Sequence, residues 1–130
     1  MFGQSTTQEK TLALDESITI SSSNYPSPYD TMIDCLWLVN GPSGSNIYMT
    51  LTAFSTEIND DFVTIGSGAD YRDAQTVVKE LDGSPTTPVT YHIASTHSWM
   101  TFASDLFSSS DTGFSIDITA SVPLGELLST

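Results

Sequence analysis

The stretch SSSNYPSPYDTMIDCLW, residues 21–37, contains the signals that decide the fold of this chain. Its first half is rich in turn-forming serine, asparagine and proline, and its second half leads into Cys35 and Trp37 without a basic residue. This composition is typical of a secreted β-domain, in which cysteines are usually paired. Because Cys35 is the single cysteine of the chain, the sequence predicts a β-domain whose cysteine lacks a partner.

Short stretches of alternating apolar and small polar residues lie along the chain. Alternation with a period of two places apolar side chains on one face of a strand and polar side chains on the other. Turn sequences such as NGPSGSN, DGSPTTP and SSSDTG separate the stretches. Strands this short and this regularly spaced predict an all-β, antiparallel sandwich. The alternating stretches are SITIS (17–21), MTLTAF (49–54), FVTI (62–65), WMTFA (99–103) and FSIDI (114–118).

One segment, DAQTVVKEL (residues 73–81), fits two structures. Its apolar residues fall at helical spacing. Thr76, Val77 and Val78, however, are consecutive β-branched residues, which favour extended backbone. We therefore expect a strand or one irregular turn here in preference to a helix.

The length of 130 residues is that of one domain. We expect an N-terminal segment over residues 1–10, a β-sandwich over residues 11–120 and a linker or docking tail over residues 121–130. No run approaches the roughly 20 apolar residues of a membrane span, and the N-terminus lacks the pattern of a signal peptide. The chain is expected not to insert into a membrane, and to be a mature domain or a piece of a longer protein. The tail carries the apolar residues Val122, Leu124, Leu127 and Leu128.

The charge of the chain excludes some classes of partner. There are 16 acidic residues against 3 basic ones (Lys10, Arg72 and Lys79), which gives a formal net charge of −13. The chain would repel a phosphate backbone or an anionic membrane surface, so neither nucleic acid nor such a membrane is expected as a partner. Cations remain, either metal ions or basic groups of another protein. Many of the acids need no role beyond keeping the domain soluble.

Several blocks of the sequence resemble the CUB domain family of extracellular modules. They occur in the family's order and extend from Ile18 to Ile118. The resemblance implies a two-sheet, jelly-roll-like antiparallel β-sandwich, which agrees with the alternation, and it implies an extracellular, secreted protein. The blocks are SNYPSPYD (23–30), CLW (35–37), LTAFSTE (51–57), DFVTIG (61–66), FASD (102–105) and GF (113–114).

The cysteines depart from the family pattern. CUB domains usually have two disulfides, and Cys35 resembles the second of their four cysteines. The others would fall near Gln8 to Lys10, near Ile58 and near Asp82, where this chain has no cysteine. A disulfide stabilises a domain by about 2–4 kcal/mol, which core burial must replace here. Cys35 is expected to be a buried, unreactive thiol on a strand, with a reactive or intermolecular thiol as the alternative. The aromatic residues expected in the core are Trp37, Phe54, Trp99 and Phe102.

Many CUB domains bind calcium at one end of the sandwich, and the resemblance implies a site formed by Glu57, Asp61 and Asp105. Calcium takes roughly six to eight oxygen ligands, which carboxylates, carbonyls and water supply. Only three residues separate Glu57 from Asp61, fewer than is usual in the family, so Asp60 is a candidate substitute. The simpler alternative is an acidic turn without a metal, because turns are often acidic. Supplementary ligands are expected from the backbone carbonyls of Phe107 and Ser108.

The same resemblance implies a function in binding other proteins. Carboxylates around an ion keep oxygens to which a lysine or arginine of a partner can dock, and such contacts gain strength when modules repeat. Glu57 and Tyr29 are the residues expected to contact the partner, and the Tyr29 hydroxyl is expected beside the ion. The prediction is a calcium-dependent protein-binding module. The alternatives are a metal-independent adhesive or self-assembling domain, and a carbohydrate-binding sandwich with exposed aromatics among Tyr48, Tyr71 and Tyr91.

Enzyme activity is not expected. A hydrolase needs a nucleophile, a base and an orienting acid held together, and the chain has two histidines, His92 and His97. His92 fits a structural role in a strand, and His97 fits a solvated turn. The sequence contains no G-x-S-x-G or H-E-x-x-H motif, so no catalytic residue is predicted.

Overall fold

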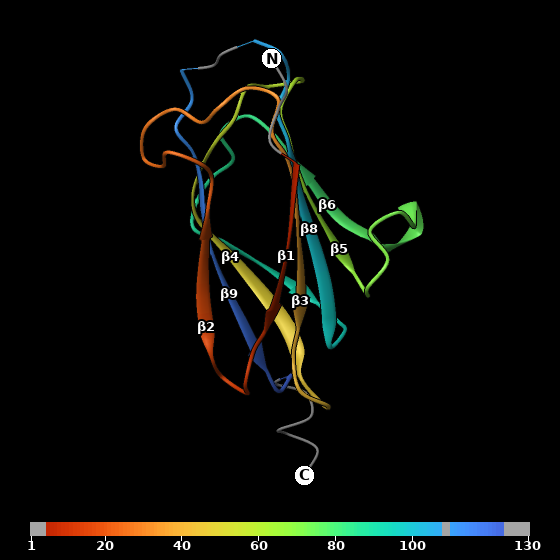
Figure 1. Cartoon of the computed structure of the whole chain (residues 1–130). Helices are drawn as coiled ribbons and strands as arrows, with labels where there is room; N and C mark the ends of the chain where they lie inside the picture. Colours follow the sequence, from red (N-terminus) through yellow and green to blue (C-terminus); the bar gives the residue numbers. More distant parts are fainter. Residues whose placement is uncertain (1–4, 108–109, 124–130) are drawn as a thin grey trace.

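The computed structural model describes residues 5–107 and 110–123, and these form a sandwich of two β-sheets (Figure 1). Within this part of the chain, one sheet has the strand order β1-β3-β8-β5-β6 and the other has the order β2-β9-β4-β7. The predicted all-β sandwich is confirmed. The elements are β1 (Ser5–Thr11), β2 (Ser17–Ser21), β3 (Asp34–Asn40), β4 (Asn46–Ser55), β5 (Phe62–Ser67), a 3-10 helix (Ala74–Thr76), β6 (Val77–Leu81), β7 (Val89–Ile93), β8 (His97–Ala103) and β9 (Gly113–Ser121).

The strand β1 belongs to the sandwich although it lies mostly in the expected N-terminal segment. It pairs with β3 in parallel, with Thr6 opposite Cys35, whereas the other ladders of the described residues are antiparallel. The boundary drawn between residues 10 and 11 therefore falls inside a strand. The sequence of β1, STTQEKT, has no apolar alternation, so nothing in it marked the strand. At the other end, β9 extends to Ser121, the first residue of the expected tail.

The core lies between the sheets and is built from alternate residues of their central strands. In β4, Ile47, Met49 and Leu51 have no exposed surface, whereas Tyr48 and Thr50 between them are half-buried. This is the period of two that a strand imposes on its side chains. Strand β9 pairs with β4 in the same sheet, and its core-facing residues are equally buried: Phe114, Ile116, Ile118 and Ala120.

Aromatic side chains fill the core toward one end of the sandwich. Phe114 is their centre: its ring lies 5.0 Å from Phe102 and 6.3 Å from Trp37, both edge-on, and 6.1 Å from Phe54. Edge-to-face pairs of this kind stabilise a fold by about 0.5–1.5 kcal/mol each beyond the burial of their area. Three of the four aromatics expected in the core, Trp37, Phe54 and Phe102, therefore lie there.

The fourth, Trp99, is buried on the other face of its sheet. Its neighbours Met100 and Phe102 belong to the core cluster, whereas Trp99 does not. A Cβ at Gly66 would overlap the Trp99 ring, so glycine allows the ring to lie against β5. The Trp99 indole N–H donates to the Thr76 hydroxyl at 3.1 Å. Residues 74–81 form a 3-10 helix followed by β6, which confirms the preference for a strand or irregular turn over an α-helix.

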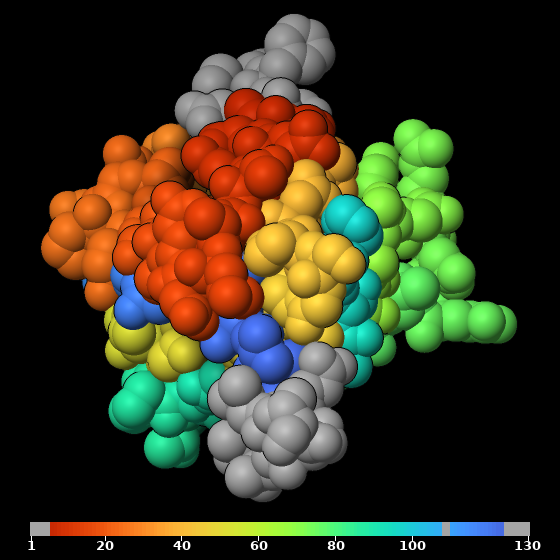
Figure 2. Space-filling model, turned by 90° about the horizontal axis from the view of Figure 1, so that it is seen from below, coloured from red at the N-terminus to blue at the C-terminus, as the bar shows by residue number. Residues whose placement is uncertain are grey.

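Three connections meet at one end of the sandwich, the upper end in Figure 1. They join β2 to β3, β4 to β5, and β8 to β9. The connection between β1 and β2 lies at the opposite end, which faces the viewer in Figure 2. The fold thus brings the acids of three distant loops to a single end.

Candidate metal centre

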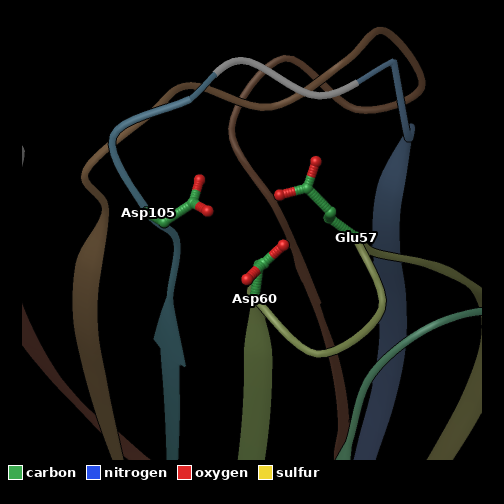
Figure 3. A group of neighbouring side chains, drawn as sticks. All are labelled: Glu57, Asp60 and Asp105. Carbon is green, nitrogen blue, oxygen red and sulfur yellow. The ribbon is translucent and has the colours of Figure 1, made fainter.

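Three acidic side chains converge at this loop end. Glu57 and Asp60 come from the β4–β5 connection and Asp105 comes from the segment after β8 (Figure 3). One carboxylate oxygen of each lies within 4.8 Å of the others. Glu57 and Asp105 are half-buried and Asp60 is exposed, so the group is open to solvent. We refer to Glu57, Asp60 and Asp105 as the carboxylate trio.

A tight turn places Glu57 and Asp60 side by side. The N–H groups of Asp60 and Asp61 both donate to the carbonyl oxygen of Glu57, at 3.3 and 3.1 Å. Asn59 has φ 70°, a left-handed backbone conformation in which asparagine is enriched. The Asn59 N–H donates to the Asp82 carboxylate at 2.7 Å. These contacts fix the backbone of the turn, and the turn holds the carboxylates of Glu57 and Asp60 close together.

Asp61 has a different place from its neighbour Asp60. It is fully buried, and both of its carboxylate oxygens accept hydrogen bonds. The Tyr29 hydroxyl donates to Oδ2 at 2.6 Å, and the Asp105 N–H donates to Oδ1 at 2.8 Å. Since Tyr29 and Asp105 belong to two other loops, one carboxylate links the β2–β3, β4–β5 and β8–β9 connections.

Tyr29 supports the centre from inside the domain. Its ring packs edge-on against Phe102, with the ring centres 5.2 Å apart, and 5 % of the residue is exposed. Besides donating to Asp61, its hydroxyl accepts the Glu57 N–H at 3.0 Å. Tyr29, which we expected to contact the partner and to lie beside the ion, thus contacts two acidic residues of the β4–β5 connection through its hydroxyl.

The predicted ligands are thus only partly brought together. Glu57 and Asp105 lie in the trio, and Asp60, the predicted substitute, is its third member. Asp61 lies beside the trio and not within it. The Phe107 N–H donates to Asp105 Oδ1 at 3.0 Å, and Ser108 lies outside the described residues.

Loss of solvent and the neighbouring acids both act on the Glu57 carboxyl. Its pKa is raised from 4.5 to about 6, first by loss of solvent and then by the charges of Asp105, Asp61 and Asp60. A raised pKa means that the ionised form is disfavoured in this position. A cation at the trio would remove that cost.

The donor set and its spacing fit a hard divalent cation. Carboxylate oxygens are the ligands that calcium prefers, at about 2.3–2.6 Å each. Two oxygens on opposite sides of one calcium ion are therefore about 4.6–5.2 Å apart. Oxygens that lie within 4.8 Å of one another can bind the same ion with little movement.

The two histidines have structural partners. The His92 ring stacks on Tyr48 with centres 4.7 Å apart, and its Nε2 lies 2.7 Å from the Asn46 side-chain oxygen. His97 begins β8 and is exposed, and its Nδ1 lies 2.8 Å from the Asn40 side-chain oxygen. Each imidazole is thus bound to an asparagine and away from the carboxylate trio.

The three tyrosines weighed for carbohydrate binding do not share one surface. Tyr48 lies on the outer face of its sheet against His92, Tyr91 packs against the core, and Tyr71 contacts the Arg72 guanidinium on the β5–β6 connection. These three rings therefore do not form the row of coplanar aromatics that the carbohydrate hypothesis requires.

Of the apolar tail residues, Leu124, Leu127 and Leu128 lie outside the described residues.

Cys35 is a half-buried free thiol on β3. The residue opposite is Thr6, whose hydroxyl lies 3.1 Å from the Cys35 sulfur. The resemblance implies the first cysteine position near Gln8 to Lys10, and the residue directly opposite Cys35 in the register is Thr6. Because β1 has no apolar pattern, the sequence held no signal for this register.

Comparison with known proteins agrees with the fold. The CUB domain family model matches residues 8–118. Among solved structures, the MASP-1 CUB2 domain bound to Ca2+ aligns with a TM-score of 0.66 and 20 % identity, covering 82 % of this chain and 96 % of that one. The extracellular region of zebrafish Gpr126/Adgrg6 aligns with a TM-score of 0.71 and 22 % identity, covering 87 % of this chain and 15 % of that one.

Curated relatives resemble parts of the chain more closely in sequence. Fibropellin-3 of Strongylocentrotus purpuratus is 34 % identical over 89 residues, which are 66 % of this chain and 16 % of that protein. Dog cubilin is 41 % identical over 46 residues, 35 % of this chain and 1 % of that protein. The chain therefore spans a small fraction of these relatives. In the described part of the chain, no helix is long and apolar enough to cross a membrane. The family match and the two-sheet fold together show that the chain belongs to the CUB domain family.

Proposed function

We propose that this CUB domain is a calcium-dependent protein-binding module. CUB domains are typically extracellular modules for protein–protein interaction, and the related MASP-1 CUB2 domain is bound to Ca2+. The observation that carries the proposal is the carboxylate trio, whose oxygens from two loops lie within 4.8 Å of one another. Carboxylates held this close repel each other. A divalent cation bound between them would neutralise their charge and attract all three.

The proposed ligands are Glu57, Asp60 and Asp105, with Asp61 as a further ligand. Each carboxylate oxygen has two lone pairs, so Asp61 can bind an ion without losing the hydrogen bonds from Tyr29 and Asp105. The backbone carbonyls of Phe107 and Ser108 remain proposed supplementary ligands. The calcium ion would supply positive charge that holds the loops together, while Asp61 and Tyr29 fix the positions of the acids.

The proposed partner is another protein that presents a lysine or arginine. Carboxylate oxygens that face outward from the ion, those of Glu57 first, would accept a charge-assisted hydrogen bond from the basic group. Tyr29 would act indirectly, by positioning Glu57. We propose an extracellular location and no catalytic activity, with a multidomain parent in which weak contacts add up.

Calorimetry with calcium on chelator-treated protein tests the metal site. We expect binding of a single ion at millimolar calcium or below, weakened at least about tenfold in Glu57→Gln, Asp60→Asn and Asp105→Asn, since each removes one charged ligand. Glu80→Gln is the matched control, because it removes the same charge from the exposed strand β6. Absence of heat and of any melting shift in the unsubstituted protein would refute the site.

The partner site is tested with a capped peptide that contains one lysine, followed by changes in the amide NMR spectrum of labelled protein. We expect binding with calcium and none after chelation. A matched peptide with glutamine in place of lysine should not bind in either condition. Equal binding of the two peptides would contradict recognition of a basic group.

A further inference from the structure

An open hollow adjoins the carboxylate trio. It has a volume of about 400 Å3 and lies between the β2–β3 connection and the end of β8. Asp105 lines it and is also a member of the trio, so the two features are continuous. We call it the apolar hollow, and its lining residues are Met32, Ile33, Asp34, Ala103, Ser104, Asp105 and Leu106.

Hydrogen bonds between the two walls hold this hollow in shape. The Met32 N–H donates to the Asp105 carbonyl at 2.8 Å, and the Ser104 N–H donates to the Ile33 carbonyl at 2.9 Å. The Ser104 hydroxyl accepts the Ile33 N–H at 2.8 Å and donates to the Asp30 carbonyl at 3.0 Å. Since both walls are tied by backbone groups, the hollow exists before any partner binds, which lowers the entropic cost of docking.

Large apolar side chains are exposed beside the acids. Leu106 is 66 % exposed, Phe107 73 % and Ile58 65 %. Seven large apolar side chains are exposed among the described residues, and these three all lie within two residues of Glu57 or Asp105. Exposed leucine, isoleucine and phenylalanine next in sequence to acids of the trio are the residue types of a protein-binding site, in which an apolar area adjoins polar anchors.

We propose that the apolar hollow receives a large apolar side chain from the partner protein whose lysine or arginine binds at the carboxylate trio. This inference rests on the proposed function and names the partner more closely: a segment with a basic residue and a leucine, methionine or phenylalanine within a few residues of it. Charge complementarity favours a basic segment, because Asp34 adds a further acid to the hollow.

The occupant is a different protein, and not a second copy of this chain. The net charge of −13 makes two copies repel each other. The basic residues of the chain are Lys10 on β1, and Arg72 and Lys79 on the β5–β6 segment, which stands out from the side of the sandwich in Figure 2. A partner with a positive net charge would be attracted over the whole acidic surface.

Matched peptides test the inference on the full chain with millimolar calcium. The probes are capped glycine–serine peptides that contain lysine and phenylalanine, lysine and alanine, or glutamine and phenylalanine, each pair separated by one or two glycines. Binding is followed by the amide NMR spectrum of labelled protein. Of the two lysine–phenylalanine peptides, we expect the tighter-binding one to bind about tenfold more tightly than the lysine–alanine peptide with the same spacing. The reason is that burial of the ring removes apolar surface from water.

The preference for phenylalanine should nearly vanish in Leu106→Ala and fall in Met32→Ala. Leu14→Ala is the control, because Leu14 is 50 % exposed and lies in the β1–β2 connection at the opposite end (Figure 1). It should keep the full preference. If Leu14→Ala reduced the preference for phenylalanine as strongly as Leu106→Ala, the inference would be overturned.

The outcomes separate the inference from the proposed function. If lysine–phenylalanine and lysine–alanine peptides bind equally well in calcium, the hollow is not a docking site, and the calcium-dependent recognition of lysine still stands. If the glutamine peptide binds as well as the lysine peptides, or if calcium has no effect, both proposals fail. Sedimentation without peptide provides the last check, because a dimer that Leu106→Ala abolishes would assign the hollow to a second copy of the chain.

Discussion

At the scale of single residues, the adjacent acids Asp60 and Asp61 have opposite surroundings. Asp60 is exposed in the carboxylate trio, whereas Asp61 is buried and binds the Tyr29 hydroxyl and the Asp105 N–H. Asp60 is the last residue of the turn, and Asp61 joins that turn to β5, so the two side chains lie in different parts of the connection. The sequence shows two identical side chains, so it predicted an acidic centre here but could not assign these two roles.

We expect Asp61→Ala to lower the free energy of unfolding by about 2–4 kcal/mol, because the substitution leaves buried donors without an acceptor. Asp60→Ala should change it by less than about 0.5 kcal/mol, as is usual for an exposed side chain. Urea unfolding in the presence of chelator measures both values without a contribution from calcium. Similar losses in the two variants would contradict the structural role of Asp61.

At the scale of secondary-structure elements, hydrogen bonds join the segments between which the resemblance to CUB domains implies disulfides. The Thr6 hydroxyl contacts the Cys35 sulfur between β1 and β3. Near Ile58 and Asp82, the Thr56 N–H donates to the Gly83 carbonyl at 2.9 Å and the Asn59 N–H donates to Asp82. Hydrogen bonds therefore join these segments without covalent links.

A disulfide introduced between positions 6 and 35 tests the parallel register of β1. In Thr6→Cys, the new thiol would face Cys35, and oxidation should raise the free energy of unfolding by about 3 kcal/mol through loop closure. Thiol titration and urea unfolding with and without reductant measure the bond and its effect. Gln8→Cys is the control: it faces Trp37 and should keep both thiols free. A bond in Gln8→Cys and none in Thr6→Cys would show that the register is wrong.

The elements also show which signals the sequence contained. Alternation revealed strands such as β4 and β9, because one of their faces is the core. It did not reveal β1, whose residues are all polar. It also placed Trp99 in the core, because β8 carries apolar residues on both of its faces. The structure shows that Trp99 lies on the outer face, where its indole contacts Thr76 of the 3-10 helix. Which strands pair, and which face of each strand is buried, depends on contacts between segments that are distant in the sequence. A single sequence does not show these contacts.

At the scale of the whole molecule, negative charge is the dominant property, and the loop end concentrates it. The chain has a formal net charge of −13, and several of its acids are close enough to shift the pKa of Glu57. Binding of a cation to the folded state alone would stabilise the whole domain by mass action. Stability and calcium binding should therefore depend on pH together.

The sign of the pH dependence follows from Glu57, whose pKa rises from 4.5 to about 6 on folding. Between these values, the folded protein holds a proton that the unfolded chain has released. Without calcium, the contribution of Glu57 to stability is thus complete below about pH 4.5 and is lost as the pH rises through about 6. Calcium needs the ionised carboxylate, so its affinity should fall about tenfold per pH unit below the pKa.

Melting curves with and without calcium, one pH unit above and one below the pKa of Glu57, test this coupling. Above the pKa, calcium should raise the melting temperature clearly, because it binds the ionised folded protein and relieves the repulsion among its acids. Below the pKa, protons compete for the same oxygens and the increase should be small. Glu57→Gln should remove most of the difference between the two pH values, and Glu80→Gln should preserve it. An equal calcium effect at both pH values would mean that Glu57 does not bind the ion.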